Sequence, residues 1–347
     1  LTSPSCTITT LEMTNLSNVH VTEACAGLFV NMLKSNTTLT SLRVDWNIFP
    51  LEELCQLFET NHKALPTTWE YSKDNLRFVE EDAVRLAKAL TAFKRLEYLK
   101  LDKFEIHPSK LKAQSHCDFS KQFLTDADVI IILSILADRN SRLELLDLSD
   151  NPDIGMYCGP TIYRLISVST GLKTINLSGC DIREALVCDI GAWLATSTLE
   201  TMYLQGCSRI ADKAALSILK GMQINKSLRI LRMDFNQISG NIMAQMIGLS
   251  HPALPPALEI NIPTTESSAT FLGDALVQNR YIESLQIGSF CFRPIDLATA
   301  KVVRLDSDGV NDLTVVTIAQ FLKRRSHALE VIDVSNINTS DIGGLGI

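Results

Sequence analysis

The chain has 347 residues, 46% of them hydrophobic and only 6% aromatic, so it can bury a large core built mainly from aliphatic side chains. Its formal charge of −7 argues against a protein that binds nucleic acid by charge attraction. Nine scattered cysteines without a CxxC pair indicate free thiols in a reducing compartment, so we expect a cytoplasmic protein. The longest apolar run, at 129–137, is too short to span a bilayer, and no membrane insertion is expected.

Short strands are predicted along the whole chain in one recurring frame. In LELLDLSDN at 143–151, Leu143, Leu146 and Leu148 stand at offsets 0, 3 and 5, and Asn151 stands at offset 8. The leucines alternate with a period of two, which predicts a strand with one buried face, and a buried Asn at the turn can bridge the backbones of stacked units. In chain order the copies start at Ile8, Leu39, Pro66, Leu96, Gln114, Leu143, Leu172, Leu199, Leu228, Pro255, Ile282, Ala300 and Leu329.

Helices are predicted between the strands. In 82–93, Leu86, Leu90 and Phe93 recur at helical spacing, with charged residues on the other side. One strand and one helix cannot bury their own apolar faces, so successive units must stack on one another.

With this frame and a period near 28, the chain resembles the leucine-rich repeats of the ribonuclease-inhibitor-like class. The resemblance implies an α/β solenoid of about 13 units, with a curved parallel β-sheet on the concave face and α-helices on the convex face. It says little about activity, because repeats of this class serve many functions.

The order of the units itself repeats. HKALP at 62–66 returns as HPALP at 251–255, and 39–47 matches 228–236 at the same interval along the chain. Next, 96–111 matches 282–297 at a slightly shorter interval. The sequence therefore predicts nearly two copies of a seven-unit super-repeat in one continuous solenoid, at 1–198 and 199–347, which we interpret as a fragment of a longer protein.

Two units are unusually short, since they run only from 96 to 114 and from 282 to 300. Such a unit has no room for a strand, a turn and a full helix. We therefore expect a proline-containing extended segment at 105–111 and at 291–297. Neither terminus shows a polar capping unit, so flanking sequence or another chain is expected to cover the ends.

Candidate chemical residues have simpler structural interpretations. His62 and His251 head the two repeated strings, but no cysteine or carboxylate cluster accompanies them, which favours loop residues that cap the preceding helix end. Cys180 and Cys207 stand at the Asn position of the frame, which favours buried core thiols over a catalytic thiol. No nucleotide, hydrolase or metal-binding motif is present, so we predict no enzyme activity, no cofactor and no metal site.

The strand residues between the core leucines are predicted to point to the concave face. Their charges alternate in sign and aromatic residues stand nearby, which favours a protein partner, with an ordinary solvated sheet surface as the alternative for each position. The best anchors are expected where the super-repeat places a cation and a ring on neighbouring exposed positions in both copies. The candidate partner-binding residues are Arg43, Trp46, Tyr98, Lys100, Asp147, Tyr203, Arg232 and Phe235.

These observations predict a non-catalytic scaffold for protein–protein interaction, cytoskeletal or regulatory, that binds a protein partner on its concave sheet. The alternative is a GTPase-activating accessory of the Ran-type leucine-rich-repeat class. That function requires an Asn or Arg on a loop near one end, and the sequence assigns no such residue.

Overall fold

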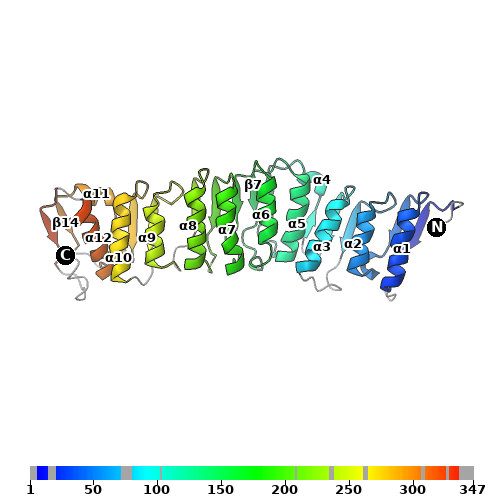
Figure 1. The fold of residues 1–347 in the computed structure, drawn as a ribbon, viewed down its shortest axis with the longest axis horizontal. Coiled ribbons are helices and arrows are strands. Elements are labelled where there is room, and N and C mark those ends of the chain that lie inside the picture. The colour runs from blue at the N-terminus through cyan, green and yellow to red at the C-terminus, as the bar shows by residue number, and fades with distance from the viewer. Residues whose placement is uncertain are drawn as a thin grey trace. The chain divides into compact units, whose positions relative to one another are not determined.

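The computed structural model describes residues 6–14, 21–71, 80–101, 104–207, 209–233, 238–260, 265–305, 309–325 and 328–335. Strands and helices alternate along the chain, which gives an α/β repeat fold. The chain divides into two compact units, Leu1–Leu172 (unit 1) and Lys173–Ile347 (unit 2). Within each unit the helices stand side by side along one side of the strands (Figure 1).

Unit 1 contains mostly parallel strand pairs. β1 pairs with β2, β3 with β4, and β6 with β7, whereas β5 runs antiparallel to β4. Its elements are β1 Thr10–Met13, α1 Glu23–Ser35, β2 Ser41–Val44, a 3-10 turn Trp46–Ile48, α2 Leu51–Thr60, β3 Thr68–Tyr71, α3 Glu80–Ala92, β4 Tyr98–Leu101, β5 Phe104–Ile106, α4 Pro108–Leu111, β6 His116–Asp118, α5 Asp126–Arg139, β7 Leu145–Asp147 and α6 Gly159–Val168.

Unit 2 follows the same plan. β8, β9 and β10 are parallel, β11 pairs with β12, β14 pairs with β15, and β13 runs antiparallel to β12. Its elements are β8 Thr174–Asn176, α7 Glu184–Thr196, β9 Thr201–Leu204, α8 Asp212–Ile224, β10 Ile230–Met233, α9 Gly240–Gly248, β11 Ala257–Ile260, α10 Glu266–Gln278, β12 Ser284–Ile287, β13 Phe290–Phe292, α11 Pro294–Thr299, β14 Val302–Arg304, α12 Asp312–Arg325 and β15 Val331–Asp333.

The predicted leucine frame forms the core. Leu143, Leu146, Leu148 and Asn151 are all fully buried. The Asn151 amide donates to the carbonyl of Phe119 at 3.0 Å, which confirms that the small polar residue at the eighth offset bridges neighbouring units. The same frame explains Cys180 and Cys207, which are buried thiols as expected.

The core of unit 1 also contains a group of aromatic rings that the low aromatic content did not predict. Trp46 lies 4.2 Å from Trp69 between ring centroids, and Phe58 lies 4.2 Å from Trp69 on another side. Phe93 extends the group at 5.8 Å from Phe58. Such pairs stabilise beyond their buried area, so this part of the core is held by rings rather than by aliphatic side chains alone.

The two short repeats contain no full helix, as predicted. The segments expected to be extended throughout are each part strand and part short helix. Each short unit turns back as an antiparallel strand, β5 or β13, before a helix of four residues in α4 and six in α11. Because so little helix fills the gap, α3 packs directly on α5 and α10 packs directly on α12.

An arginine spans each of these gaps. Arg139 at the end of α5 donates to the carbonyl oxygens of Phe93 at 2.7 Å and of Leu96 at 3.0 Å. Arg325, at the end of α12, donates to the carbonyl of Val277 in α10 at 3.0 Å. Each guanidinium thereby binds backbone carbonyl groups at, or just after, the C-terminal end of the facing helix, α3 or α10.

The two repeated histidines have one structural role. His62 Nε2 lies 2.8 Å from the carbonyl oxygen of Asn36, and its Nδ1 accepts from the amide of Ala64. His251 makes the same two contacts with Asn225 and Ala253, at 3.5 and 3.1 Å. Each histidine thus contacts the Asn that caps the C-terminal end of the helix one repeat earlier, α1 or α8. The sequence had predicted a contact with the end of the helix directly before the histidine.

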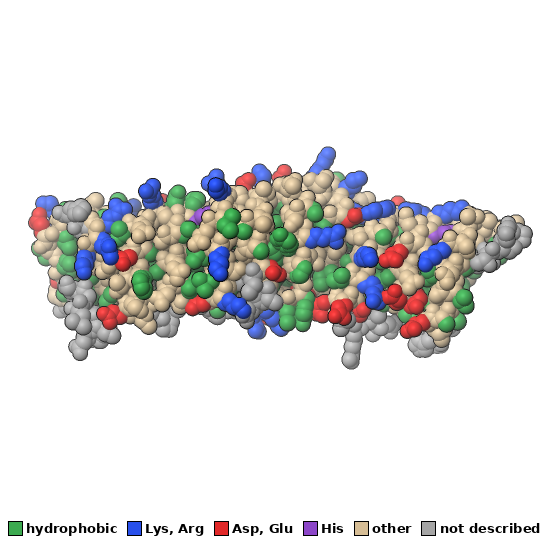
Figure 2. All heavy atoms as spheres, viewed as in Figure 1, with side chains coloured by type: hydrophobic (Ala, Val, Ile, Leu, Met, Phe, Trp, Pro, Cys, Tyr) green, Lys and Arg blue, Asp and Glu red, His purple; other side chains and the backbone are tan. Residues whose placement is uncertain are grey.

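The helix side of unit 1 shows ordinary helix-terminus charge. In Figure 2, red acidic side chains gather low on the face over α2 and α3, whose first turns contain Glu52, Glu53, Glu80, Glu81 and Asp82. Acidic residues stabilise the positive end of the helix dipole, so these carboxylates stabilise the N-terminal ends of α2 and α3.

No helix in the described part of the chain is both long enough and apolar enough to cross a membrane.

Candidate protein-interaction surface

The outward side chains of the strands form an ordered row, which we call the outer row. In β2, Leu42 and Val44 are buried whereas Arg43 is exposed, as strand alternation requires. Strand pairing then aligns the corresponding third positions across neighbouring strands. The aligned residues are Glu12 with Arg43, Glu70 with Lys100, Asp118 with Asp147, Asn176 with Tyr203 and Arg232, Glu259 with Gln286, and Arg304 with Asp333.

Several charges in the outer row are partly neutralised by neighbours. Arg43 lies 3.2 Å from the carboxylate of Glu12, and both side chains are more than half exposed. Exposed ion pairs contribute little stability, so the pair sets the local charge rather than the fold. Lys100 lies between Glu70 and Glu105 on the adjacent strands.

Tyr98 belongs to the same part of the surface. Its hydroxyl donates to Glu105 at 2.9 Å. Local desolvation, together with the hydrogen bond to Glu105 and the charges of Glu105 and Glu70, raises the pKa of Tyr98. The phenol is therefore an oriented donor at the edge of β4, on the same side as Lys100.

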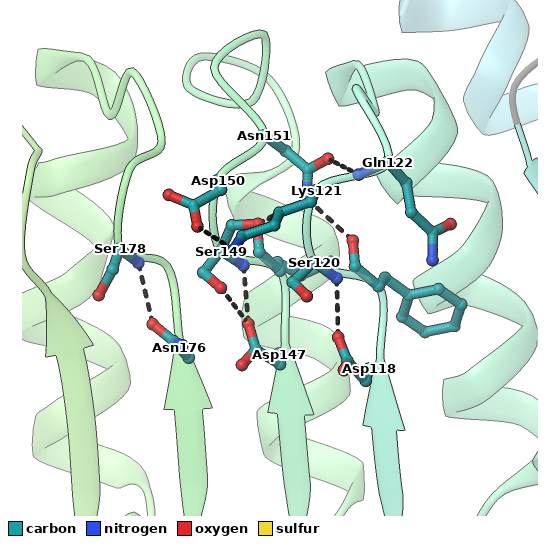
Figure 3. Close-up of polar contacts among 12 residues, drawn as sticks. Asp118, Ser120, Lys121, Gln122, Asp147, Ser149, Asp150, Asn151, Asn176 and Ser178 are labelled. Carbon is teal, nitrogen blue, oxygen red and sulfur yellow. Dashed lines mark hydrogen bonds and ion pairs between the residues drawn. The ribbon is translucent and has the colours of Figure 1, made fainter.

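The outer-row residues at the ends of β6, β7 and β8 each fix their own turn (Figure 3). Asp118 accepts from the Ser120 amide at 2.9 Å, and Asp147 accepts from the Ser149 amide at 2.8 Å. Asn176 accepts from the backbone two residues later in the same way. The bonds from Ser120 lower the pKa of Asp118, so its carboxylate stays charged over a wider pH range.

Aliphatic side chains also stand on the outward side of the strands, where only aromatic and charged residues were predicted. Ile230, Val302 and Val331 are 39%, 47% and 50% exposed. Val302 lies directly opposite Val331 in the register, two positions before the Arg304–Asp333 pair and on the same face of the strands. The signal was present in the sequence, because each is a β-branched residue two positions before a predicted outward residue.

The predicted anchors differ in accessibility. Arg43, Lys100 and Arg232 are exposed, and Tyr98, Asp147 and Tyr203 are half-buried. Trp46 was wrongly expected to be exposed beside Arg43. It is 9% exposed because it continues the buried positions of Leu42 and Val44 into the core. Phe235 lies outside the described residues.

Other chemistry has little support in the geometry. Cys207 Sγ lies 3.2 Å from the carbonyl oxygen of Leu177, a contact typical of a core thiol. Among the residues that the structure describes, no three His, Cys, Asp or Glu side chains are grouped so that they could hold a metal ion. The arrangement offers an oriented surface of charged, aromatic and aliphatic side chains.

Comparison with known proteins gives likenesses among solved structures but none among families or curated sequences. No family model matches the chain, and no curated protein sequence matches it. Among solved structures, the leucine-rich repeat-containing protein LegL7 from Legionella pneumophila matches 83% of this chain and 86% of its own, with 12% sequence identity and a TM-score of 0.31. At that TM-score the likeness carries no conclusion about partners or activity.

Proposed function

We propose that this protein is a non-catalytic scaffold for protein–protein interaction, and that a protein partner binds the outward side of its strands. The observation that carries the proposal is the outer row, in which strand register aligns charged side chains next to the exposed Val302–Val331 pair. Charged residues that surround an apolar centre are typical of protein interfaces. Pairing within the sheet fixes the spacing of these side chains, which lowers the entropy lost on binding.

The proposed anchors are the accessible members of the predicted set. Arg43, Lys100 and Asp147 belong to unit 1, and Tyr203 and Arg232 belong to unit 2, with Tyr98 at the edge of the Lys100 strand. Arginine and tyrosine contribute most often to binding energy at interfaces. Trp46 is not among the proposed anchors because its ring lies in the core. Phe235 remains an anchor predicted from the sequence alone.

We also propose that the chain is a leucine-rich-repeat solenoid of the ribonuclease-inhibitor-like class, built of two super-repeat copies at 1–198 and 199–347. The element positions support this. β2, α2 and β3 begin at 41, 51 and 68, and β10, α9 and β11 begin at 230, 240 and 257, which is one constant interval. β4, β5 and β6 begin at 98, 104 and 116, and β12, β13 and β14 begin at 284, 290 and 302, which is again one constant interval.

Two further expectations remain proposals. The eight cysteines that the structure describes are free thiols, which supports a cytoplasmic location. That flanking sequence or another chain covers the ends stays a prediction from the sequence.

The test begins with affinity enrichment from native extract and continues with direct binding of each recovered protein to purified chain. Arg43→Ala with Arg232→Ala should weaken binding at least tenfold and leave the circular-dichroism spectrum unchanged. The control, Arg164→Ala with Lys220→Ala, removes equal charge from exposed positions on helices α6 and α8 and should bind normally.

Equal binding by the anchor variant and the control variant would contradict the outer row as the binding surface. A GTP hydrolysis assay with a panel of small GTP-binding proteins separates the Ran-type alternative. Stimulated hydrolysis would replace the scaffold proposal.

A further inference from the structure

Two neighbouring loops in unit 1 are held by buried polar side chains. The loop at 119–125 precedes α5 and is tied to Asn151, which is fully buried. Asn151 Oδ1 accepts from the amides of Gln122 at 3.1 Å and Leu124 at 3.0 Å (Figure 3). Every hydrogen-bonding atom of this Asn side chain is thereby committed to backbone, which fixes the path of the loop on either side of Phe123.

The second loop, at 152–158, is held by Asp126 in the first turn of α5. The Asp126 carboxylate is 7% exposed and accepts from four consecutive amides. These are the amides of Gly155 at 3.1 Å, Met156 at 2.9 Å, Tyr157 at 3.1 Å and Cys158 at 3.4 Å. A buried carboxylate is costly unless it is hydrogen-bonded, so Asp126 and this loop stabilise one another in a single conformation.

The two fixed loops present large apolar side chains to solvent. Phe123 is 65% exposed, Tyr157 is 46% exposed and Met156 is 37% exposed. Together we call these three side chains the loop patch. Aromatic rings and methionine often contact an apolar side chain of a partner protein. When the backbone that holds them is already fixed, little conformational entropy is lost on binding.

Phe123 is conformationally unfavourable where it stands. Its φ is 54°, in the left-handed region that side chains other than glycine seldom adopt. The corresponding position of the second super-repeat copy is Gly309, with a φ of 107°. Unit 2 therefore uses the residue that such a backbone favours, whereas unit 1 places an exposed ring there at a cost to folding. A residue other than glycine in such a backbone conformation is often found at functional positions.

The charge around the loop patch is negative. The ranges 118–126 and 147–158 contain five carboxylates and one cation, Lys121, which lies 3.9 Å from Asp150. Asp118, Asp150 and Asp153 are exposed, and Asp147 is half-buried. Asp118 and Asp147 are oriented by their own turns, so their negative charges have fixed positions at the ends of the strands that lead into the two loops.

We propose that the loop patch, with the carboxylates of Asp118, Asp147, Asp150 and Asp153 around it, docks a peptide segment of a partner in which an apolar side chain is flanked by lysine or arginine. Charge complementarity selects a basic segment, because an acidic one would bring like charges together at close range. The inference rests on the proposed function in that the partner is a protein, but it does not require the outer-row anchors Arg43 and Arg232.

The probe is a set of twelve-residue peptides with Leu, Phe or Trp at the centre, flanked by Lys and Arg, by Ser, or by Glu. Binding to the full chain is measured by fluorescence anisotropy. Basic-flanked peptides should bind at least tenfold more tightly than Ser-flanked ones, Glu-flanked peptides should not bind, and added salt should weaken the basic series.

Phe123→Gly is the decisive variant. It removes the ring but supplies the residue that the backbone favours, so melting temperature should stay level or rise while affinity falls at least tenfold. Tyr157→Ala should also lose affinity. Leu28→Ala removes a 70%-exposed leucine from α1 and is the matched control, with binding unchanged.

A second pair of variants separates local charge from the overall negative charge. Asp118→Asn with Asp150→Asn should reduce the preference for basic over neutral peptides. The Asp118→Asn change keeps an oxygen that can accept from the Ser120 amide, so the turn should be preserved. Glu23→Gln with Glu283→Gln changes net charge equally at exposed positions away from these loops and should preserve the preference.

Several results would overturn the inference. These are equal binding of basic and acidic peptides, normal affinity in Phe123→Gly, or no binding by any peptide at millimolar concentration. A dimer that Phe123→Gly dissociates would show that a second copy covers the loop patch instead. With the protein recovered from native extract as the ligand, loss of binding in Phe123→Gly but not in the double arginine variant would contradict the outer-row proposal and leave the loop-patch inference standing. Loss of binding in the double arginine variant alone would contradict the loop-patch inference and leave the outer-row proposal standing.

Discussion

Replacing Asp126 by alanine should release the loop at 152–158. Of the four amides that its carboxylate accepts, those of Gly155 and Cys158 are buried, whereas those of Met156 and Tyr157 can reach water. A buried amide left unsatisfied costs about 1–3 kcal/mol, so two of them give about 2–6 kcal/mol. Relief of the buried negative charge offsets part of this, and we expect a loss of about 3 kcal/mol.

Hydrogen exchange is the suitable assay, because a repeat protein of this length need not unfold in one step. The opening free energy of the Gly155 and Cys158 amides should fall by the stated amount in Asp126→Ala and by roughly half as much in Asp126→Asn, which keeps one acceptor oxygen. Asp153→Ala, an exposed carboxylate in the same loop, should change it by less than about 0.5 kcal/mol. If Asp126→Ala and Asp153→Ala behave alike, the four bonds do not hold the loop.

Three further predictions concern packing, pH and thiol reactivity. Gly191→Ala should destabilise the protein by about 1–3 kcal/mol because the added methyl group meets the backbone of α8. Gly27→Ala should stabilise it by about 0.5–1 kcal/mol because the added methyl group there meets no other atom. Thermal unfolding of both variants measures the two effects. Burial lowers the pKa of His251 below its usual 6.5, so the folded state favours the neutral imidazole. The free energy of unfolding, measured with urea, should therefore fall as pH drops below about 6.5, and this dependence should be absent in His251→Gln. Burial raises the pKa of Cys55 to about 12, so mass spectrometry after brief alkylation at neutral pH should find Cys25 modified and Cys55 intact; rapid modification of Cys55 would contradict its burial.

The parts of the fold that depend on local periodicity were accessible from the sequence. Leu146 and Leu148 are buried because alternation puts them on one face, and Asn151 bridges units because a turn needs its backbone groups satisfied. The lack of a full-length helix between 96 and 114 followed from the length of that repeat alone. The antiparallel turn of β5 did not, because its pairing with β4 depends on how the chain returns within the unit.

The features missed were those that depend on groups in different repeats. Asp126 and the amides of 155–158 meet only after two units have stacked, and no spacing in the sequence marks that contact. The left-handed backbone at Phe123 is set by the bonds from Asn151 on either side of it. Trp46 was a different kind of error, because its even spacing from Leu42 and Val44 already indicated burial.

Residues separated by the proposed super-repeat interval are the same at some positions and different at others. The bridging pairs keep their identity, since Asn36 and His62 of the first copy correspond to Asn225 and His251 of the second. These residues bond backbone, so any change would leave buried groups unsatisfied whatever the protein binds.

The outer row keeps its identity only in part, because Arg43, Glu70 and Asp147 correspond to Arg232, Glu259 and Asp333 but two other positions differ. Asp118 in the first copy corresponds to Arg304 in the second, a reversal of charge, and Lys100 corresponds to the neutral Gln286. Since both positions point outward from equivalent strands, stacking of the units does not require these differences. A ligand complementary to the acidic pair of β6 and β7 would meet a cation at the same place on β14. The two regions therefore differ in local charge, and we propose that they bind two different partners, or two different parts of one elongated partner.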